Sequence, residues 1–373
     1  MSFSKDSINI LIVMYFKKQI ALLKKSIFFS VLMSSFLLIS CSGDSGGGNP
    51  VTSAPSNLVV SAVLAGTSTQ NPNGDGSGTV NFSINATNAT SYKILLGNGE
   101  IKEVTDGNFT YTYTTSGTYT YVIYVSAYNS GKFVSTSITI TIYIAPTALW
   151  SDEFNVDGAP NSSKWGYDLG AGGWGNNELQ YYTSRPENII VQNGVLKIMA
   201  LKESYLGSSY TSARILSKGK FSFKYGRVDI KAKLPAGAGT WPALWMLGDN
   251  IDTASWPACG EIDIMEHAGN RLNTITTALH YPGHSGGNPD VGSTTIANAS
   301  TTFHIYSLEW RETYIKIFVD NQLFQTFTNS ASLPFNQNFF LIFNSAMGGS
   351  YGGTVDPNFT SSSFEIDYIR VYN

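Results

Sequence analysis

The chain has little cysteine and little charge. Its 373 residues include two cysteines, Cys41 and Cys259, so a framework of disulfide bonds is excluded. Charged residues make up 13% of the sequence and the net charge is −3, so composition does not favour binding to nucleic acid or to an anionic surface. No long amphipathic helical pattern is present. Abundant Gly, Ser, Thr, Tyr and Phe therefore favour an all-β protein.

Tryptophan is also missing from the first 149 residues, and all seven lie at or after Trp150. Residues 51–145 alternate apolar and polar side chains between turn signals, which predicts a small immunoglobulin-like β-sandwich. The stretches 109–119 and 138–142 resemble the closing strands of a PKD-type domain. Sugar-binding sites favour indole rings, on which sugars stack, so this Trp-free domain is expected to be a spacer. Sugar binding through its tyrosines is the alternative.

The N-terminus resembles a bacterial lipoprotein signal. Lysines precede an apolar stretch over residues 27–39, which ends Leu38-Ile39-Ser40-Cys41. This lipobox-like ending predicts that residues 1–41 are the signal and that Cys41 carries the lipid, with an ordinary cleaved signal as the alternative. Residues 42–50 read as a flexible tether. We expect a cell-envelope protein attached to the outer membrane by its lipid anchor, with surface exposure left open.

Residues 148–373 again read as many short strands. Examples are 195–200, 227–232 and 315–319, and the last is followed by Asp320-Asn321, which predicts a hairpin turn. This number of strands favours two large stacked antiparallel sheets, a β-jelly-roll.

One strand of this region carries three carboxylates, in Gly260-Glu261-Ile262-Asp263-Ile264-Met265-Glu266. Alternation places Glu261 and Asp263 on one face and would place Glu266 on the other. A β-bulge absorbing one residue, most simply Met265, would return Glu266 to the carboxylate face. A pair of carboxylates is what a retaining glycosidase needs, with Asp263 between them to hold the nucleophile. Solvated acids on an edge strand and a cation site are the alternatives.

The same run resembles the active-site signature of family 16 glycoside hydrolases, in the form with the extra bulge residue. Further stretches that match in the expected order are 172–182, 210–215, 233–235, 241–247 and 364–372. The resemblance implies a jelly-roll that hydrolyses β-glucans or algal galactans with retention and without a catalytic cofactor. It also implies Glu261 as the nucleophile, Asp263 as its assistant and Glu266 as the general acid/base.

The resemblance implies further site residues. The expected substrate-binding residues are Trp241, Trp245, Trp256, Asn177, Arg214 and His280. One of the three tryptophans is expected to pack in the core instead of binding sugar. The alternative role of Arg214 is a structural ion pair, and that of His280 is a purely structural position. Many relatives hold a structural Ca²⁺ ion away from catalysis, and the matching positions are Glu153, the Gly194 carbonyl and Asp367. Asp367 has a second reading as a buried hydrogen-bonding acid.

The substrate implied by stretches 172–182 and 256–259 is a laminarin-type β-1,3-glucan, with mixed β-1,3/1,4-glucan included. The alternatives are a hydrolase of algal galactans, a transglycosylase and, from another class, a sugar-binding lectin. A lectin has no need of three aligned acids. We expect a monomer with no nucleic-acid partner.

Overall fold

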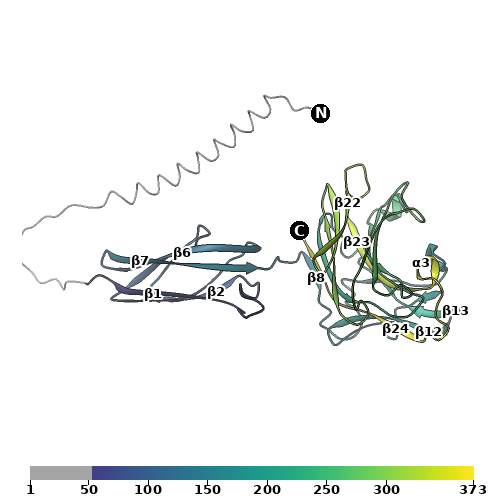
Figure 1. Cartoon of the computed structure of the whole chain (residues 1–373), viewed down its shortest axis with the longest axis horizontal. Coiled ribbons are helices and arrows are strands. Elements are labelled where there is room, and N and C mark those ends of the chain that lie inside the picture. The colour runs from purple at the N-terminus through teal and green to yellow at the C-terminus, as the bar shows by residue number, and fades with distance from the viewer. Residues whose placement is uncertain (1–52) are drawn as a thin grey trace, which may run out of the picture. The chain divides into compact units, whose positions relative to one another are not determined.

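The computed structural model describes residues 53–373 (Figure 1). The predicted signal over residues 1–41, with Cys41, and the tether over 42–50 lie outside the described residues. Within the described residues, no helix is both long enough and apolar enough to cross a membrane.

The first part of the described chain forms two small sheets. One has the strand order β1-β2-β5 and the other β4-β3-β6-β7. Their strands are β1 (Ser56–Leu64), β2 (Thr79–Thr87), β3 (Ser91–Leu95), β4 (Ile101–Val104), β5 (Asn108–Thr112), β6 (Gly117–Asn129) and β7 (Lys132–Ile144). The predicted alternation is confirmed, because every second residue of β2, such as Val80, Phe82 and Ile84, is buried.

The rest of the chain forms the predicted jelly-roll of two large sheets (Figure 1). The ten-stranded sheet has the order β10-β13-β12-β24-β15-β20-β21-β22, with β11 paired to β12 and β8 to β24. Its strands are β8 (Trp150–Asp152), β10 (Gln180–Tyr182), β11 (Ile189–Gln192), β12 (Val195–Tyr205), β13 (Ser208–Ser212), β15 (Gly226–Lys233), β20 (His304–Trp310), β21 (Tyr314–Val319), β22 (Gln322–Thr328) and β24 (Ser361–Tyr372).

The seven-stranded sheet has the order β19-β18-β17-β16-β23-β14-β9. Its strands are β9 (Gly166–Asp168), β14 (Arg214–Leu216), β16 (Thr240–Gly248), β17 (Glu261–His267), β18 (Thr274–His280), β19 (Asp290–Thr295) and β23 (Phe339–Met347). Three one-turn helices of the described chain follow strands of this sheet: η1 (Gly173–Gly175) between β9 and β10, α2 (Ile251–Ala254) between β16 and β17, and α3 (Gly349–Gly352) between β23 and β24.

The core between these sheets fixes which face of each strand is outward. Leu244 and Met246 of β16 and Ile262 of β17 are fully buried in one cluster with Val228 and Ile230 of the ten-stranded sheet. Burying each such side chain contributes about 1.5–3 kcal/mol, and a one-residue slip of a strand would expose its whole set. The register of β16 and β17 is therefore strongly determined, and their remaining side chains must face away from the core.

The predicted turn at Asp320-Asn321 is confirmed. Val319 pairs with Gln322 across the hairpin, so the connection between β21 and β22 has two residues. Both have left-handed backbone angles, with φ of 49° and 62°. Two such residues are typical of a type I′ turn, whose twist matches that of the strands.

Candidate active site

The β-bulge in β17 is present and brings the three acids to one face. Against β16, Asp263 pairs with Trp245 and Met265 with Leu244, so Ile264 has no partner of its own. The prediction of one extra residue is confirmed, but its placement at Met265 was wrong by one position on this side of the strand. Ile264 and Met265 are both fully buried in the core, because the bulge lets two consecutive residues point the same way.

On the outward face, the cross-strand pairs place the acids among polar and aromatic neighbours. Glu261 lies opposite His280 of β18, and Glu266 lies opposite Thr276 of β18 and Ala243 of β16. His267, which follows Glu266, is fully buried on the core side.

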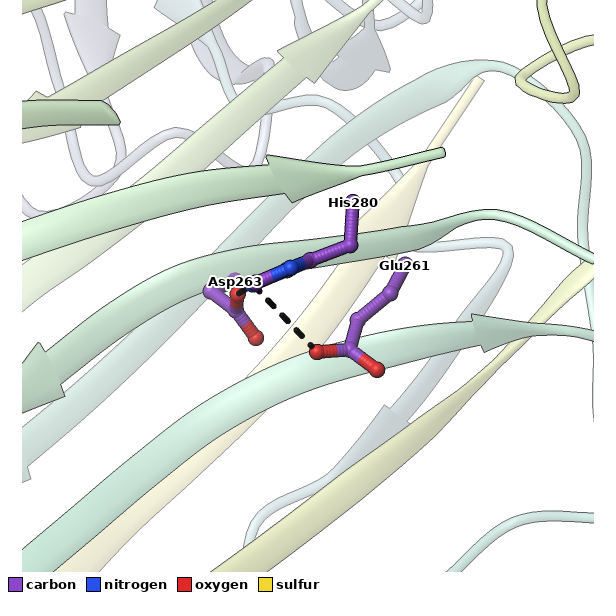
Figure 2. A group of neighbouring side chains, drawn as sticks. All are labelled: Glu261, Asp263 and His280. Atoms are coloured by element: carbon purple, nitrogen blue, oxygen red, sulfur yellow. Dashed lines mark ion pairs between the residues drawn. The ribbon is translucent and has the colours of Figure 1, made fainter. Parts of the chain in front are cut away.

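Figure 2 shows Glu261 and Asp263 on β17 with His280 on the neighbouring strand. The Nε2 atom of His280 lies 3.3 Å from Oδ2 of Asp263 and 3.7 Å from Oε1 of Glu261. Possible ligand atoms of the three residues all lie within 4.8 Å of one another, which is close enough for a shared cation. We read the group as a carboxylate–imidazole cluster instead, because His280 already contacts both carboxylates.

Each of the two outer acids accepts a hydrogen bond from an indole. Trp256 Nε1 donates to Oε2 of Glu261 at 3.0 Å, and Trp241 Nε1 donates to Oε1 of Glu266 at 2.9 Å. Trp256 is 44% exposed, whereas Trp241 is 9% exposed. Trp241 is therefore the tryptophan of this set that packing explains best.

Burial raises the proton affinity of all three acids. It raises the pKa of Glu261 to about 8, and the charge of Asp263 adds to this while His280 opposes it. Burial and the charge of Glu266 hold the pKa of Asp263 well above its usual range. Burial likewise raises the pKa of Glu266, and the hydrogen bond from Trp241 opposes that rise. Three such acids cannot all ionise near neutral pH, so the cluster retains a proton.

A partly buried chain of hydrogen bonds holds Trp245 on the same face. Trp245 Nε1 donates to Oδ1 of Asn344 at 2.7 Å, and Asn344 donates to the hydroxyl of Tyr182 at 3.0 Å. Tyr182 in turn donates to Oε2 of Glu178 at 3.1 Å. Asn344, Tyr182 and Glu178 are not among the predicted site residues, although the last two lie in the stretch 172–182 that matches the family.

Arg214 is held by an ion pair and by two indole rings, and its contact with sugar stays a prediction. Its Nε atom lies 2.9 Å from Oδ2 of Asp168, so the ion-pair alternative is present. Its guanidinium also lies between two indoles, 4.9 Å from the ring of Trp174 and 4.8 Å from that of Trp245. The ion pair and the stacking fix the side chain on the outward face beside Trp245.

Asn177 lies outside these contacts. It is exposed and left-handed at φ 59°, just after η1. The carbonyl of the neighbouring Asn176 accepts a hydrogen bond from the backbone of Ser350, which anchors this loop beside α3. The loop position suits a residue that reaches for substrate, but the contacts do not tie Asn177 to the carboxylates.

The three positions implied for Ca²⁺ lie around the point where β24 changes partners. Strand β24 pairs with β12 up to Ile366 and with β8 from Ile369, which places Gly194 and Glu153 at the same edge of β24. The carboxylate of Asp367 is paired with Lys231 of β15, at the other edge. The carboxylates of Glu153 and Asp367 both form ion pairs with basic side chains. Glu153 makes two hydrogen bonds of 2.9 and 2.8 Å to Arg370, and Asp367 lies 2.7 Å from Lys231. A Ca²⁺ ion could use them only by displacing these side chains.

Comparisons with known proteins agree with this geometry. The model of the family described as "Glycosyl hydrolases family 16" matches residues 176–370, more than half of the chain. The chain belongs to this family. A β-glucanase of Rhodothermus marinus is 46% identical over 240 residues, which cover 60% of this chain and 84% of that protein.

Two further similarities concern structure and substrate range. The X-ray structure of the laminarinase from Rhodothermus marinus matches with a TM-score of 0.59 and 45% identity, over 61% of this chain and 96% of that one. A keratan-sulfate endo-1,4-β-galactosidase of Sphingobacterium multivorum is 32% identical over 64% of this chain and 57% of its own length. The family is thus one of glycoside hydrolases, and membership alone does not name the sugar.

The raised pKa of Glu261 has a consequence for stability. Its folded pKa of about 8 lies above the usual 4.5, so the folded state binds more protons and loses stability as pH rises between these values. We expect Glu261→Gln to raise the free energy of unfolding at pH 7.5 by about 2 kcal/mol, and Tm by about 4–8 °C. The gain should shrink at pH 5. Thermal unfolding of the variant and of Glu309→Gln, a control in β20, at both pH values measures it; a lower Tm for Glu261→Gln at pH 7.5 would contradict the expectation.

Proposed function

We propose that this protein is a retaining endo-β-1,3-glucanase that cleaves laminarin-type glucans, with mixed β-1,3/1,4-glucans included. The observation that carries the proposal is the outward face of β17. There the bulge aligns Glu261, Asp263 and Glu266, and an indole donor holds each outer acid. The names of the similar β-glucanase and laminarinase support the β-1,3-glucan as substrate.

In the first step, a carboxylate oxygen of Glu261 attacks the anomeric carbon while Glu266 protonates the departing glycosidic oxygen. Trp241 occupies Oε1 of Glu266, so Oε2 is the atom that carries this proton. Glu261 attacks as a carboxylate, so it must first lose the proton that burial favours; the hydrogen bond from Trp256 and the neighbouring His280 oppose that rise in its pKa. A proton retained on Asp263 would make it a hydrogen-bond donor to the nucleophile.

In the second step, Glu266 takes a proton from a water molecule, and the oxygen of that water attacks the anomeric carbon. The bond between this carbon and Glu261 breaks, which releases the Glu261 carboxylate. Trp245, Arg214 and the exposed ring of Trp256 are the proposed sugar contacts. Glucose rings have apolar faces that stack on indoles, and their hydroxyls accept hydrogen bonds from a guanidinium.

The catalytic assignment predicts different losses for the two outer acids. We expect Glu261→Ser to lower kcat for laminarin by about 10³-fold or more, because no nucleophile remains. Glu266→Gln should lose about 10²–10⁴-fold on laminarin and less on an activated aryl glucoside, whose leaving group needs no proton. Release of reducing sugar by the full chain, with Glu309→Gln as the control, measures both.

Undiminished activity in Glu261→Ser would overturn the catalytic assignment. Hydrolysis of agarose or carrageenan in preference to laminarin would support the alternative of a galactan hydrolase. The similarity to a keratan-sulfate endo-1,4-β-galactosidase is the observation that favours this alternative. Longer products in the presence of added acceptor sugars would identify a transglycosylase, since retaining chemistry permits transfer.

We also propose that the enzyme is a lipoprotein of the outer membrane and that residues 51–145 form an immunoglobulin-like spacer. The lipobox-like ending at Cys41 supports the anchor, and seven strands in two Trp-free sheets support the spacer. We expect Cys41→Ser to abolish labelling with radioactive palmitate in a Gram-negative host and to release the protein from the membrane fraction. Persistent labelling would contradict the anchor site.

A structural Ca²⁺ ion at Glu153, Gly194 and Asp367 is a further proposal, supported by the position of all three beside the same segment of β24. A ligand bound only by the folded state at 100 times its Kd stabilises it by about 2.7 kcal/mol. We therefore expect Ca²⁺ to raise the Tm of EDTA-treated protein by several degrees, and Glu153→Gln to reduce this rise. An unchanged Tm would show that the ion pairs with Arg370 and Lys231 persist in place of the metal.

A further inference from the structure

The turn α3 lies directly on Trp241, the residue that donates to Glu266. A Cβ atom at Gly349 would lie 3.3 Å from the Trp241 ring, and one at Gly352 would lie 3.2 Å from its Cβ. Gly349 is left-handed at φ 74°, which glycine adopts without strain. A side chain at either glycine would therefore crowd Trp241.

Tyr351 of this turn connects Trp241 to β18. Its ring centroid lies 5.3 Å from that of Trp241, and its hydroxyl is hydrogen-bonded to Oγ1 of Thr276. The same Thr276 hydroxyl donates to the backbone carbonyl of Glu266 at 3.3 Å. Tyr351 thus touches the indole that holds the Glu266 carboxylate and the threonine that holds its backbone.

Arg271 covers the ring of Tyr351. Its guanidinium carbon lies 4.6 Å from the ring centroid, within the range of a cation–π contact. The backbone of Arg271 is fixed in the turn after β17, because its N–H donates to the carbonyl of Ala268 and its own carbonyl accepts from Thr274. A permanent positive charge is consequently held at the Glu266 end of the carboxylate row.

We propose that Arg271, held against Tyr351, is a positioning residue that sets the proton affinity of the general acid/base Glu266. The inference rests on the proposed function. Glu266 must hold a proton in the first step and release it before the second, so an affinity that is too high slows the second step. Tyr351 holds the guanidinium of Arg271 on one ring and contacts Trp241 with the same ring. Arg271 itself is exposed, so its effect on Glu266 depends on the salt concentration.

The groups around Glu266 leave few other sources of positive charge. Glu261 and Asp263 face it from its own strand and are acids, while β16 contributes the neutral Trp241. Tyr351 from α3 is neutral, since burial raises its pKa, and His280 on β18 is shared with the other two acids. His280 and Arg271 both lower the pKa of Glu266 against the effect of burial, and of these Arg271 carries a charge at every working pH.

The test compares pH profiles of kcat/KM on laminarin for the wild type, Arg271→Met and Arg271→Lys. We expect Arg271→Met to move the alkaline limb upward by roughly 0.3–0.5 pH unit, and Arg271→Lys to restore most of the wild-type limb. Raising NaCl from about 0.05 to 0.5 M should also move the alkaline limb of the wild type to higher pH, because salt screens the charge of Arg271. The alkaline limb of Arg271→Met should not move with salt. Arg311→Met, next to the hairpin of β20 and β21, is the matched control.

An unmoved alkaline limb in Arg271→Met, with only KM or Tm changed, would overturn the proposal in favour of a substrate contact or a packing role. If Arg271→Met does not fold, the salt dependence of the wild type is the test. An alkaline limb that does not move with salt would overturn the proposal. Titration of Glu266 by carboxyl ¹³C NMR gives the same readout without substrate. Failure of laminarin hydrolysis is therefore distinguishable from failure of this inference.

Discussion

The packing of β16 and β17 against the ten-stranded sheet is the constraint on which the site depends. Fully buried residues such as Leu244, Met246 and Ile262 fix the register of both strands, and slipping either by one residue would expose its apolar set to water. Alternation then leaves Glu261 and Asp263 no face but the outward one. The bulge at Ile264 and Met265 places two consecutive apolar side chains in the core, so Glu266 also lies on the outward face.

The same constraint places three acids where none of them is well solvated. Burial raises the pKa of each, so the folded protein holds a proton that an unfolded chain would release near neutral pH. The site reduces part of this cost with hydrogen bonds from Trp256 and Trp241 and with the imidazole of His280. A retained proton is also what acid catalysis uses, so the destabilising cluster and the proposed chemistry have one physical origin.

Neighbouring residues make the face rigid rather than merely polar. Asn344 and Tyr182 connect Trp245 to Glu178 through partly buried hydrogen bonds, and Arg214 is held between two indoles and Asp168. At the other end, the glycines of α3 let Tyr351 press against Trp241. Side chains held from two or three directions keep their positions when substrate arrives, which lowers the entropy lost on binding.

The sequence by itself determined the strand pattern, the turn at Asp320-Asn321, the three acids and the extra residue that realigns them, because these follow from local periodicity and turn chemistry. It did not determine which residue the bulge displaces, since that depends on pairing with both neighbouring strands. It also did not show that Trp241 packs under α3, that Arg370 and Lys231 already neutralise the acids implied for Ca²⁺, or that Arg271 covers Tyr351. Those contacts join residues far apart in the chain or depend on the depth of burial, and only tertiary structure brings such residues together.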